Sequence, residues 1–376
     1  MWDLVVVGAG PAGATAAVAA LRRRPDAQVL LLDRDDFPRD KSCGDGVAPH
    51  ALDVLTELGV DLLRGDVPVD RLRLGFPDGP RVAGRMRRPA YVVPRAELDA
   101  RLVAAAVDAG AVLRRARVRT LERRGDHVLV GGEPARVVVG ADGANGVTRR
   151  LAGVAAPTAG TVAVAIRGYA PVRPDLAGEQ AIVFAPVGWP AYAWSFPVGD
   201  GRANVGYGEL VRPGRDLSRR HLLDRLDDLL PGCAAAASGW RAHHLPLSSG
   251  RPRQPDGRVL LAGDALSLVN PMTGEGIYYA VLSGSLAGAG AVADDGIDPG
   301  RAYRRALQRD LGRHLRHTDL AARLARTHRV VAAGVDAAAR DPRAFDALVE
   351  LGLGRGLLGP RLLGGLSRAL VRPSVS

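Results

Sequence analysis

The stretch Leu-Val-Val-Val-Gly-Ala-Gly-Pro-Ala-Gly at residues 4–13 decides the fold of this chain. Its four apolar residues predict a buried strand, and the glycines after them match the pattern Gly-x-Gly-x-x-Gly. The alanine-rich segment 12–24 predicts a helix that ends at a proline, and the apolar run 29–33 predicts a second strand. Strand, glycine loop, helix and strand form a βαβ unit, whose two strands lie parallel in one sheet.

A glycine loop in this position is suited to a dinucleotide. The glycines let the backbone turn tightly and approach a pyrophosphate, while the free N–H groups at the helix start attract its negative charge. Asp33 lies 20 residues after Gly13, where its carboxylate can accept hydrogen bonds from a ribose. The pattern recurs at 354–359 without a clear strand before it, so there we expect only a loop between helices.

Composition excludes several classes of protein. A hydrophobic content of 47% with 24% charged residues is typical of a folded domain. The net charge of +11 would suit a nucleic-acid partner, but Lys41 is the only lysine among 51 basic residues. Such an arginine excess indicates a coding bias, and we therefore predict no nucleic-acid partner.

The cysteines and the apolar runs indicate where in the cell the protein is located. Cys43 and Cys233 lie too far apart in sequence to form a metal-ligand or disulfide pattern, which fits a reducing cytoplasm. The N-terminus has no signal-peptide pattern, and no apolar run reaches the ~18–20 residues that span a bilayer. The sequence predicts a cytoplasmic protein, either soluble or peripheral at the inner face of the membrane.

Further along the chain, two regions differ in pattern. Helices are expected at 51–63 and 97–109 and from about 274, with buried strands at 137–139 and 258–262. Short strands near 72–76, 82–86 and 91–93 precede strands at 162–167, 180–184, 192–197 and 203–207, which predict an antiparallel sheet. Beyond Pro299 the chain reads as helical and arginine-rich, with glycine- and leucine-rich turns from 351 to 370.

Four segments resemble a large flavoprotein family that includes aromatic hydroxylases, flavin halogenases and geranylgeranyl reductases. They are 94–99, 140–143, 261–265 and 270–276. The resemblance implies an α/β fold, with a Rossmann-like FAD-binding domain, an inserted antiparallel-sheet substrate domain and C-terminal helices. The expected FAD-binding domain comprises 1–70, 88–155 and 255–298. The substrate domain comprises 71–87 and 156–254, and the helical region 299–376.

The resemblance also implies which residues bind FAD, tightly and without a covalent bond. Arg95 would reach the cofactor, Asp264 would bond its ribityl chain, and backbone N–H groups of the 270–276 loop would face the flavin pyrimidine edge. The complete expected set is Gly8, Gly10, Ala12, Gly13, Asp33, Arg34, Lys41, Cys43, Gly44, Arg95, Asp142, Gly263, Asp264, Pro271, Gly274, Gly276 and Ile277.

Two more segments resemble the geranylgeranyl reductases in particular. Residues 38–46 resemble their Lys-x-Cys-Gly segment, and 191–200 with 204–208 resemble their Tyr-x-Trp-x-Phe-Pro strand. Alternation along that strand places Tyr192, Trp194 and Phe196 on one face, as a cavity wall or as ordinary core. The strand is also similar to the Trp-x-Trp-x-Ile-Pro strand of flavin halogenases, with Tyr and Phe in place of the first Trp and the Ile.

Cys43, Tyr192 and Trp194 are the expected catalytic residues. Reduction of an isolated alkene needs a hydride on one carbon and a proton on the other, and a dry apolar pocket suits both transfers. Cys43 or Tyr192 could supply or relay the proton, and the sequence does not rank them. Lys41 would favour the Cys43 thiolate, although a free cysteine can equally be a small buried hydrophobe. Histidines, including the pair at 243–244, carry no expected role.

The rest of the sequence bears on two possible partners, an electron donor and a membrane. No second strand-backed glycine loop is present for NAD(P)H, so NAD(P)H or a redox protein would be a transient electron donor. Nine arginines between 301 and 329 accompany a stripe of Leu307, Leu311 and Leu315. A basic amphipathic helix of this kind can lie on an anionic bilayer or pack on the core, and the sequence leaves both open.

The sequence therefore predicts an FAD-dependent reductase that saturates double bonds of a lipophilic isoprenoid chain of the geranylgeranyl or prenyl-quinone type. The alternative is a flavin-dependent monooxygenase or halogenase that acts on an aromatic or carrier-bound metabolite. A flavin-binding redox sensor or a membrane-surface adaptor without turnover is the third hypothesis.

Overall fold

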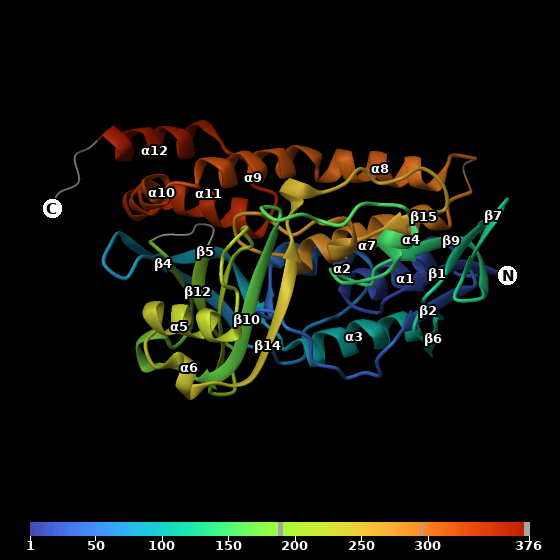
Figure 1. Cartoon of the computed structure of the whole chain (residues 1–376), viewed down its shortest axis with the longest axis horizontal. Coiled ribbons are helices and arrows are strands. Elements are labelled where there is room, and N and C mark those ends of the chain that lie inside the picture. The colour runs from blue at the N-terminus through green and yellow to red at the C-terminus, as the bar shows by residue number, and fades with distance from the viewer. Residues whose placement is uncertain (187–190, 295, 372–376) are drawn as a thin grey trace.

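The computed structural model in Figure 1 describes residues 1–186, 191–294 and 296–371. Its first sheet has seven strands in the order β6-β2-β1-β9-β8-β7, with β15 also paired to β9. The strands are β1 (Trp2–Val7), β2 (Val29–Asp33), β6 (Val112–Arg115), β7 (Leu121–Arg124), β8 (His127–Val130), β9 (Glu133–Gly140) and β15 (Val259–Leu261). The pairs β1–β2 and β1–β9 are parallel, so the predicted βαβ unit is confirmed. The predicted strands did not include β6 or the β7–β8 hairpin.

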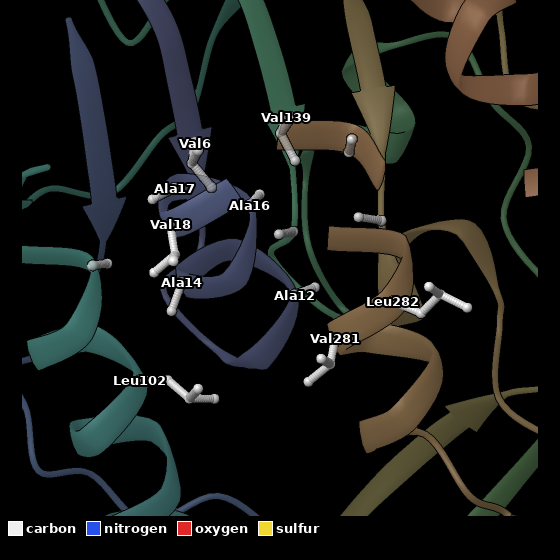
Figure 2. Close-up of a cluster of buried hydrophobic side chains, with 14 of the residues drawn as sticks. Val6, Ala12, Ala14, Ala16, Ala17, Val18, Leu102, Val139, Val281 and Leu282 are labelled. Atoms are coloured by element: carbon white, nitrogen blue, oxygen red, sulfur yellow. The ribbon is translucent and has the colours of Figure 1, made fainter. Parts of the chain in front are cut away.

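Helices α1 (Pro11–Arg23), α3 (Arg95–Asp108) and α7 (Ile277–Ala291) cover one face of this sheet. Figure 2 shows Ala12 of α1 beside Val281 and Leu282 of α7, and Ala16 of α1 next to the strand side chains Val6 and Val139. Small residues allow this contact, because a Cβ added at Gly284 would lie 2.1 Å from the Ala12 carbonyl oxygen. Helices α2 (Pro49–Glu57) and α4 (Thr148–Leu151) complete this part of the chain. The predicted helix 51–63 is shorter, because Gly59 adopts a positive φ of 71°.

The second sheet has eight strands in the order β14-β10-β13-β12-β11-β4-β5-β3. They are β3 (Gly46–Val47), β4 (Pro68–Gly75), β5 (Arg81–Val92), β10 (Val162–Pro171), β11 (Glu179–Phe184), β12 (Ala191–Pro197), β13 (Arg202–Leu210) and β14 (Ser238–Pro246), and helices α5 (Arg219–Leu229) and α6 (Cys233–Ala236) pack nearby. The antiparallel sheet predicted from 162–167, 180–184, 192–197 and 203–207 is confirmed in β10 to β13. Strands β4 and β11 pair with each other in parallel, and β3 and β14 were not predicted.

The predicted domain division stays a prediction. Strands β3, β4 and β5 assign 46–47, 68–70 and 88–92 to the second sheet, although we expected these residues in the first domain. The predicted strands at 82–86 and 91–93 are one continuous strand, β5.

Five helices follow: α8 (Pro299–Asp310), α9 (Gly312–Leu324), α10 (His328–Arg340), α11 (Pro342–Leu353) and α12 (Pro360–Val371). They lie as a layer along the top of the molecule in Figure 1. The leucine stripe packs on the core of the first sheet, where Leu311 and Leu315 are buried and Leu307 is partly buried. This stripe is therefore not available to a bilayer.

The last helices correct one prediction. The expected turns at 351–370 are largely helix α12, because leucines at 362 and 366 pack inward against α9 and α11. The second glycine pattern at 354–359 lies between α11 and α12, as predicted. Within the described residues, no helix is long and apolar enough to cross a membrane.

The contact between α1 and α7 can be tested at Gly288. A Cβ there would lie 1.9 Å from the Ala16 carbonyl oxygen, so Gly288→Ala should force the helices apart and lower the free energy of unfolding by about 1–3 kcal/mol. Gly290 on the same helix has no atom within 4 Å of such a Cβ, and Gly290→Ala should be neutral or stabilising by up to about 1 kcal/mol. Urea denaturation of both variants measures the difference, and equal effects would contradict the close contact.

Candidate functional site

One cavity of about 660 Å³ runs between the two sheets and the C-terminal helices. Of the nineteen expected site residues, all line it except Gly13 and Gly263. These two glycines are needed for the backbone instead. A Cβ at Gly13 would lie 1.7 Å from the Gly8 carbonyl oxygen, and Gly263 has a positive φ of 58°. The structure thus brings the expected residues together from six segments of the chain, namely 8–12, 33–44, 95, 142, 192–194 and 264–277.

The glycine loop and Asp33 form one end of the cavity. Gly8 has a φ of 97°, and Gly10 caps α1 without any side-chain hydrogen bond to the helix N–H groups. Asp33 accepts hydrogen bonds from the Ala9 N–H at 2.7 Å and the Asp35 N–H at 3.0 Å. Its carboxylate therefore stiffens the loop and still has lone pairs for a ribose.

Arg95 is buried and does not point freely into the cavity. Its guanidinium donates two hydrogen bonds to Asp99, at 2.7 and 2.8 Å. Arg39 lies 3.2 Å from the same Asp99 and 3.6 Å from Asp33. Arg39 was not among the expected site residues although it lies in the 38–46 segment, because only the fold brings it between these two acids.

Asp142 lines the cavity, but its carboxylate is occupied. It accepts the N–H groups of Val147 at 2.6 Å and Thr148 at 2.9 Å, and the Thr148 hydroxyl. These contacts fix the turn before α4, so the side chain shapes the cavity wall.

Lys41, Asp264 and His243 are three ionisable side chains further along the cavity. The Lys41 Nζ lies 3.9 Å from an Asp264 oxygen. Burial, opposed by Asp264, lowers the pKa of Lys41. Burial and the charge of Lys41 lower the pKa of His243 to about 4, and its Nε2 has no hydrogen-bond partner among the described residues. The sequence assigned His243 no role, since nothing in its surroundings along the chain indicates that it faces this pair.

The segment that carries Cys43 is tied to the second sheet through Asn204. This fully buried side chain donates to the Cys43 carbonyl at 2.8 Å and to Asp45 at 2.8 Å, and accepts from the Trp194 indole N–H at 2.8 Å. The Tyr169 hydroxyl also donates to Asp45, and Arg241 binds Asp40 at 2.7 Å. The predicted sites did not include Asp45 and Asn204, whose neighbours come from distant strands.

The three aromatic side chains of β12 share one face, as predicted. The ring centroids of Tyr192 and Trp194 are 6.0 Å apart, and those of Trp194 and Phe196 are 6.4 Å apart. A Cβ at Gly44 would lie 3.5 Å from Phe196 and 3.6 Å from Trp194, so this face packs on the Cys43 segment. The Tyr192 hydroxyl donates to the Thr273 carbonyl of the 270–276 loop.

The acids at this end of the cavity keep their protons. Burial raises the pKa of the Cys43 thiol, and the positive charge of Arg95 does not outweigh it. Burial thus opposes the expected thiolate, and Lys41, whose own pKa is lowered, lies near Asp264. Burial also raises the pKa of Tyr192.

Glu275, near the end of the 270–276 loop, is a further acid that the sequence did not single out. Burial raises its pKa to about 7, although its carboxylate accepts the Tyr278 N–H at 2.8 Å. It lines the cavity with Cys43 and Tyr192, and its charge would raise the pKa of both. Its position among glycines in a turn was the one available signal in the sequence.

These residues fit FAD. An uncapped helix start behind a Gly8 of positive φ offers the pyrophosphate free N–H groups, and Asp33 lies beside it. From there the cavity continues past Lys41 and Asp264 to the Pro271–Ile277 backbone. Its volume lies within the range of about 300–1,000 Å³ that is usual for ligand pockets.

Comparisons with known proteins agree with this geometry. Residues 1–185 match the family described as FAD binding domain. The chain is 34% identical over 314 residues to menaquinone reductase of Mycolicibacterium smegmatis, which covers 76% of this chain and 75% of that protein. It is 34% identical to digeranylgeranylglycerophospholipid reductase 1 of Methanopyrus kandleri, over 77% of this chain and 80% of that protein.

A solved structure shares the fold. The geranylgeranyl bacteriochlorophyll reductase-like protein of Thermoplasma acidophilum superposes with a TM-score of 0.78 at 19% identity, over 98% of this chain and 96% of that one.

The buried Asp45 should make stability depend on pH. Burial raises its pKa from 3.8 to about 6, so between these values the folded protein keeps a proton that the unfolded chain has lost. Ionisation of this group as the pH rises therefore lowers the free energy of unfolding of the wild type by up to about 3 kcal/mol. Asp45→Asn has no carboxyl group at this position, so it should not show this loss. The free energy of unfolding of the variant relative to wild type should increase from pH 4 to pH 7. An identical difference at both pH values would contradict the assignment.

Proposed function

The chain belongs to the family of FAD-dependent reductases that includes menaquinone reductase and digeranylgeranylglycerophospholipid reductase, and from this premise we propose that it saturates double bonds in the isoprenoid chain of a lipid. The observation that carries the proposal is the continuity of the cavity. It extends from the glycine loop, past Cys43 and the aromatic face of β12, into an apolar branch between the C-terminal helices.

The apolar branch suits a chain rather than a compact ring. Its walls come from α9 to α12 and include Ala321, Leu324, Val331, Val335, Leu348 and Leu362. A branched hydrocarbon chain buries its methyl groups against such side chains without an unsatisfied polar group. Trp194, held by Asn204, is the rigid wall where the branch meets the Cys43 segment.

FAD supplies the hydride in this family of reactions, and the residues of the chain position the alkene and provide the proton. Cys43 Sγ and Tyr192 Oη hold their protons at neutral pH, since burial raises the pKa of each. Glu275, with a pKa of about 7, is the acid that can replace a spent proton on either side chain. Exclusion of water by the apolar walls keeps the proton transfer within the cavity.

The electron donor is proposed to dock transiently. NAD(P)H or a redox protein would reduce the flavin, because the second glycine pattern lies between α11 and α12 and follows no strand. An isoprenoid lipid resides in a bilayer, so we further propose that the protein works at the inner face of the membrane.

Turnover can be measured without air. In the purified protein, a lipid with an unsaturated prenyl chain should reoxidise the reduced FAD. Mass spectrometry should then find the chain heavier by about 2 Da for each double bond that was reduced. Menaquinone and a geranylgeranyl glycerophospholipid are the two substrates to compare. The same lipids with saturated chains are the controls, since a quinone ring alone also accepts electrons. Oxygen-dependent insertion of oxygen or halide into an aromatic compound, with no change in the prenyl lipids, would favour the monooxygenase or halogenase.

The length of the substrate chain should depend on the apolar branch. Val331→Trp places a large ring in a wall of this branch, so KM for a long prenyl chain should rise at least about tenfold while a one-isoprene analogue is unaffected. Ala339→Trp is the matched control, because Ala339 is exposed on the same helix α10 and does not line the cavity. Flavin content is measured on each preparation. Equal KM changes for both chain lengths would argue against a chain-binding branch.

A further inference from the structure

The apolar branch of the cavity reaches the surface at the end of α9. Leu324 lines the cavity and is also 42% exposed, so its side chain stands at the opening. Leu320, one turn earlier, is 49% exposed, and Leu363 on α12 is 42% exposed. Ala321 and Leu362, which adjoin these leucines in sequence, belong to one buried cluster, so the end of α9 and the start of α12 lie together. Figure 1 shows these helices in the layer at the top of the molecule.

Four exposed arginines lie on α9, in the segment after it and at the start of α10. Arg316, Arg323, Arg326 and Arg329 are exposed, and in the part of the chain that the structure describes their guanidinium groups form no ion pair or hydrogen bond with another residue. On the preceding helix, by contrast, Arg304 binds Asp256 and Arg309 lies 2.9 Å from Asp310. The acid nearest in sequence on α9, Asp319, is engaged by Arg251 at 2.8 Å. The charge of the four arginines is therefore uncompensated.

We propose that Leu320, Leu324 and Leu363, with Arg316, Arg323, Arg326 and Arg329, form a surface that docks on an anionic phospholipid bilayer. The leucines would enter the acyl boundary and the arginines would bind lipid phosphates. This inference rests on the proposed function, since it supposes that a prenyl lipid must reach the cavity. Docking at this surface would let the lipid pass from the bilayer into the cavity without crossing water. It differs from the leucine stripe of Leu307, Leu311 and Leu315, which is buried in the core.

Charge complementarity selects the bilayer over a second copy of this chain. A second copy would bring a surface of the same charge, and four unpaired arginines would then face four others. A bilayer with anionic headgroups neutralises them and accepts exposed leucines at the same time.

Vesicle sedimentation tests the surface with the FAD-loaded protein. Wild type should bind vesicles of phosphatidylglycerol and phosphatidylcholine in equal amounts at least tenfold more strongly than pure phosphatidylcholine vesicles, and added salt should weaken the binding. Arg323→Glu/Arg326→Glu/Arg329→Glu and, separately, Leu320→Asp/Leu363→Asp should each lower that binding at least tenfold. Neither Leu320 nor Leu363 lines the cavity.

Matched controls separate charge from location. Arg119, Arg215 and Arg219 are also exposed, on other elements of the chain, and their replacement by Glu should leave most of the vesicle binding intact. Equal losses in the two charge-reversal variants would overturn the docking surface, as would wild-type binding that is indifferent to anionic lipid. Loss of self-association in the leucine variant with unchanged vesicle binding would also overturn it, in favour of an interface between copies.

A second readout keeps this inference distinct from the proposed function. With a prenyl lipid dissolved in detergent micelles, both docking variants should turn over at the wild-type rate, since the altered residues lie outside the catalytic residues. With the lipid embedded in anionic vesicles, their rate should fall at least tenfold. Failure of turnover in micelles by wild type itself refutes the function, whereas equal vesicle rates for wild type and variants refute the docking surface alone.

Discussion

The close contact between α1 and α7 is the constraint on which the site depends. Backbone carbonyls of Ala12 and Ala16 occupy the space where Gly284 and Gly288 lack side chains. Helix α1 begins at the glycine loop, and α7 begins directly after the 270–276 loop. Because the two helices touch along their backbones, these two loops, more than 250 residues apart in sequence, line the same cavity. A wider helix spacing would leave a cofactor in contact with one loop only.

A second set of contacts fixes the Cys43 segment against the other sheet. Asn204 forms hydrogen bonds with Cys43, Asp45 and Trp194 at once, so it ties the segment to the aromatic strand. Arg167, fully buried, adds bonds to Asp40 and to the Gly239 carbonyl, the latter at 3.0 Å. The helix contact thus sets the glycine-loop end of the cavity, and the Asn204 contacts set the end where we propose that the substrate binds. A reductase needs both, since the two reactants must approach within van der Waals distance.

The sequence predicted the elements with strong local signals. The βαβ unit at 4–33 has a complete local pattern, and the alternation at 192–196 correctly placed three aromatic rings on one face. The β7–β8 hairpin has no strong alternation, and α12 was missed because its glycines suggested turns while its burial depends on α9 and α11. His243, Asp45 and Glu275 were missed for a different reason. Burial perturbs the pKa of each, and because that burial depends on the fold, the neighbours in sequence give no indication of it.

Burial acts on the titratable groups of the site in one consistent direction. It raises the pKa of Cys43, Tyr192, Glu275 and Asp45, and it lowers that of Lys41 and His243. Every one of these shifts favours the neutral form of its group, because the cavity walls solvate charge poorly. A site that holds protonated acids beside an apolar branch can give a proton to a weakly basic carbon, whereas ionised acids there would have none to give. In the proposed function, the walls that accept the hydrocarbon chain therefore also keep the proton that its reduction consumes.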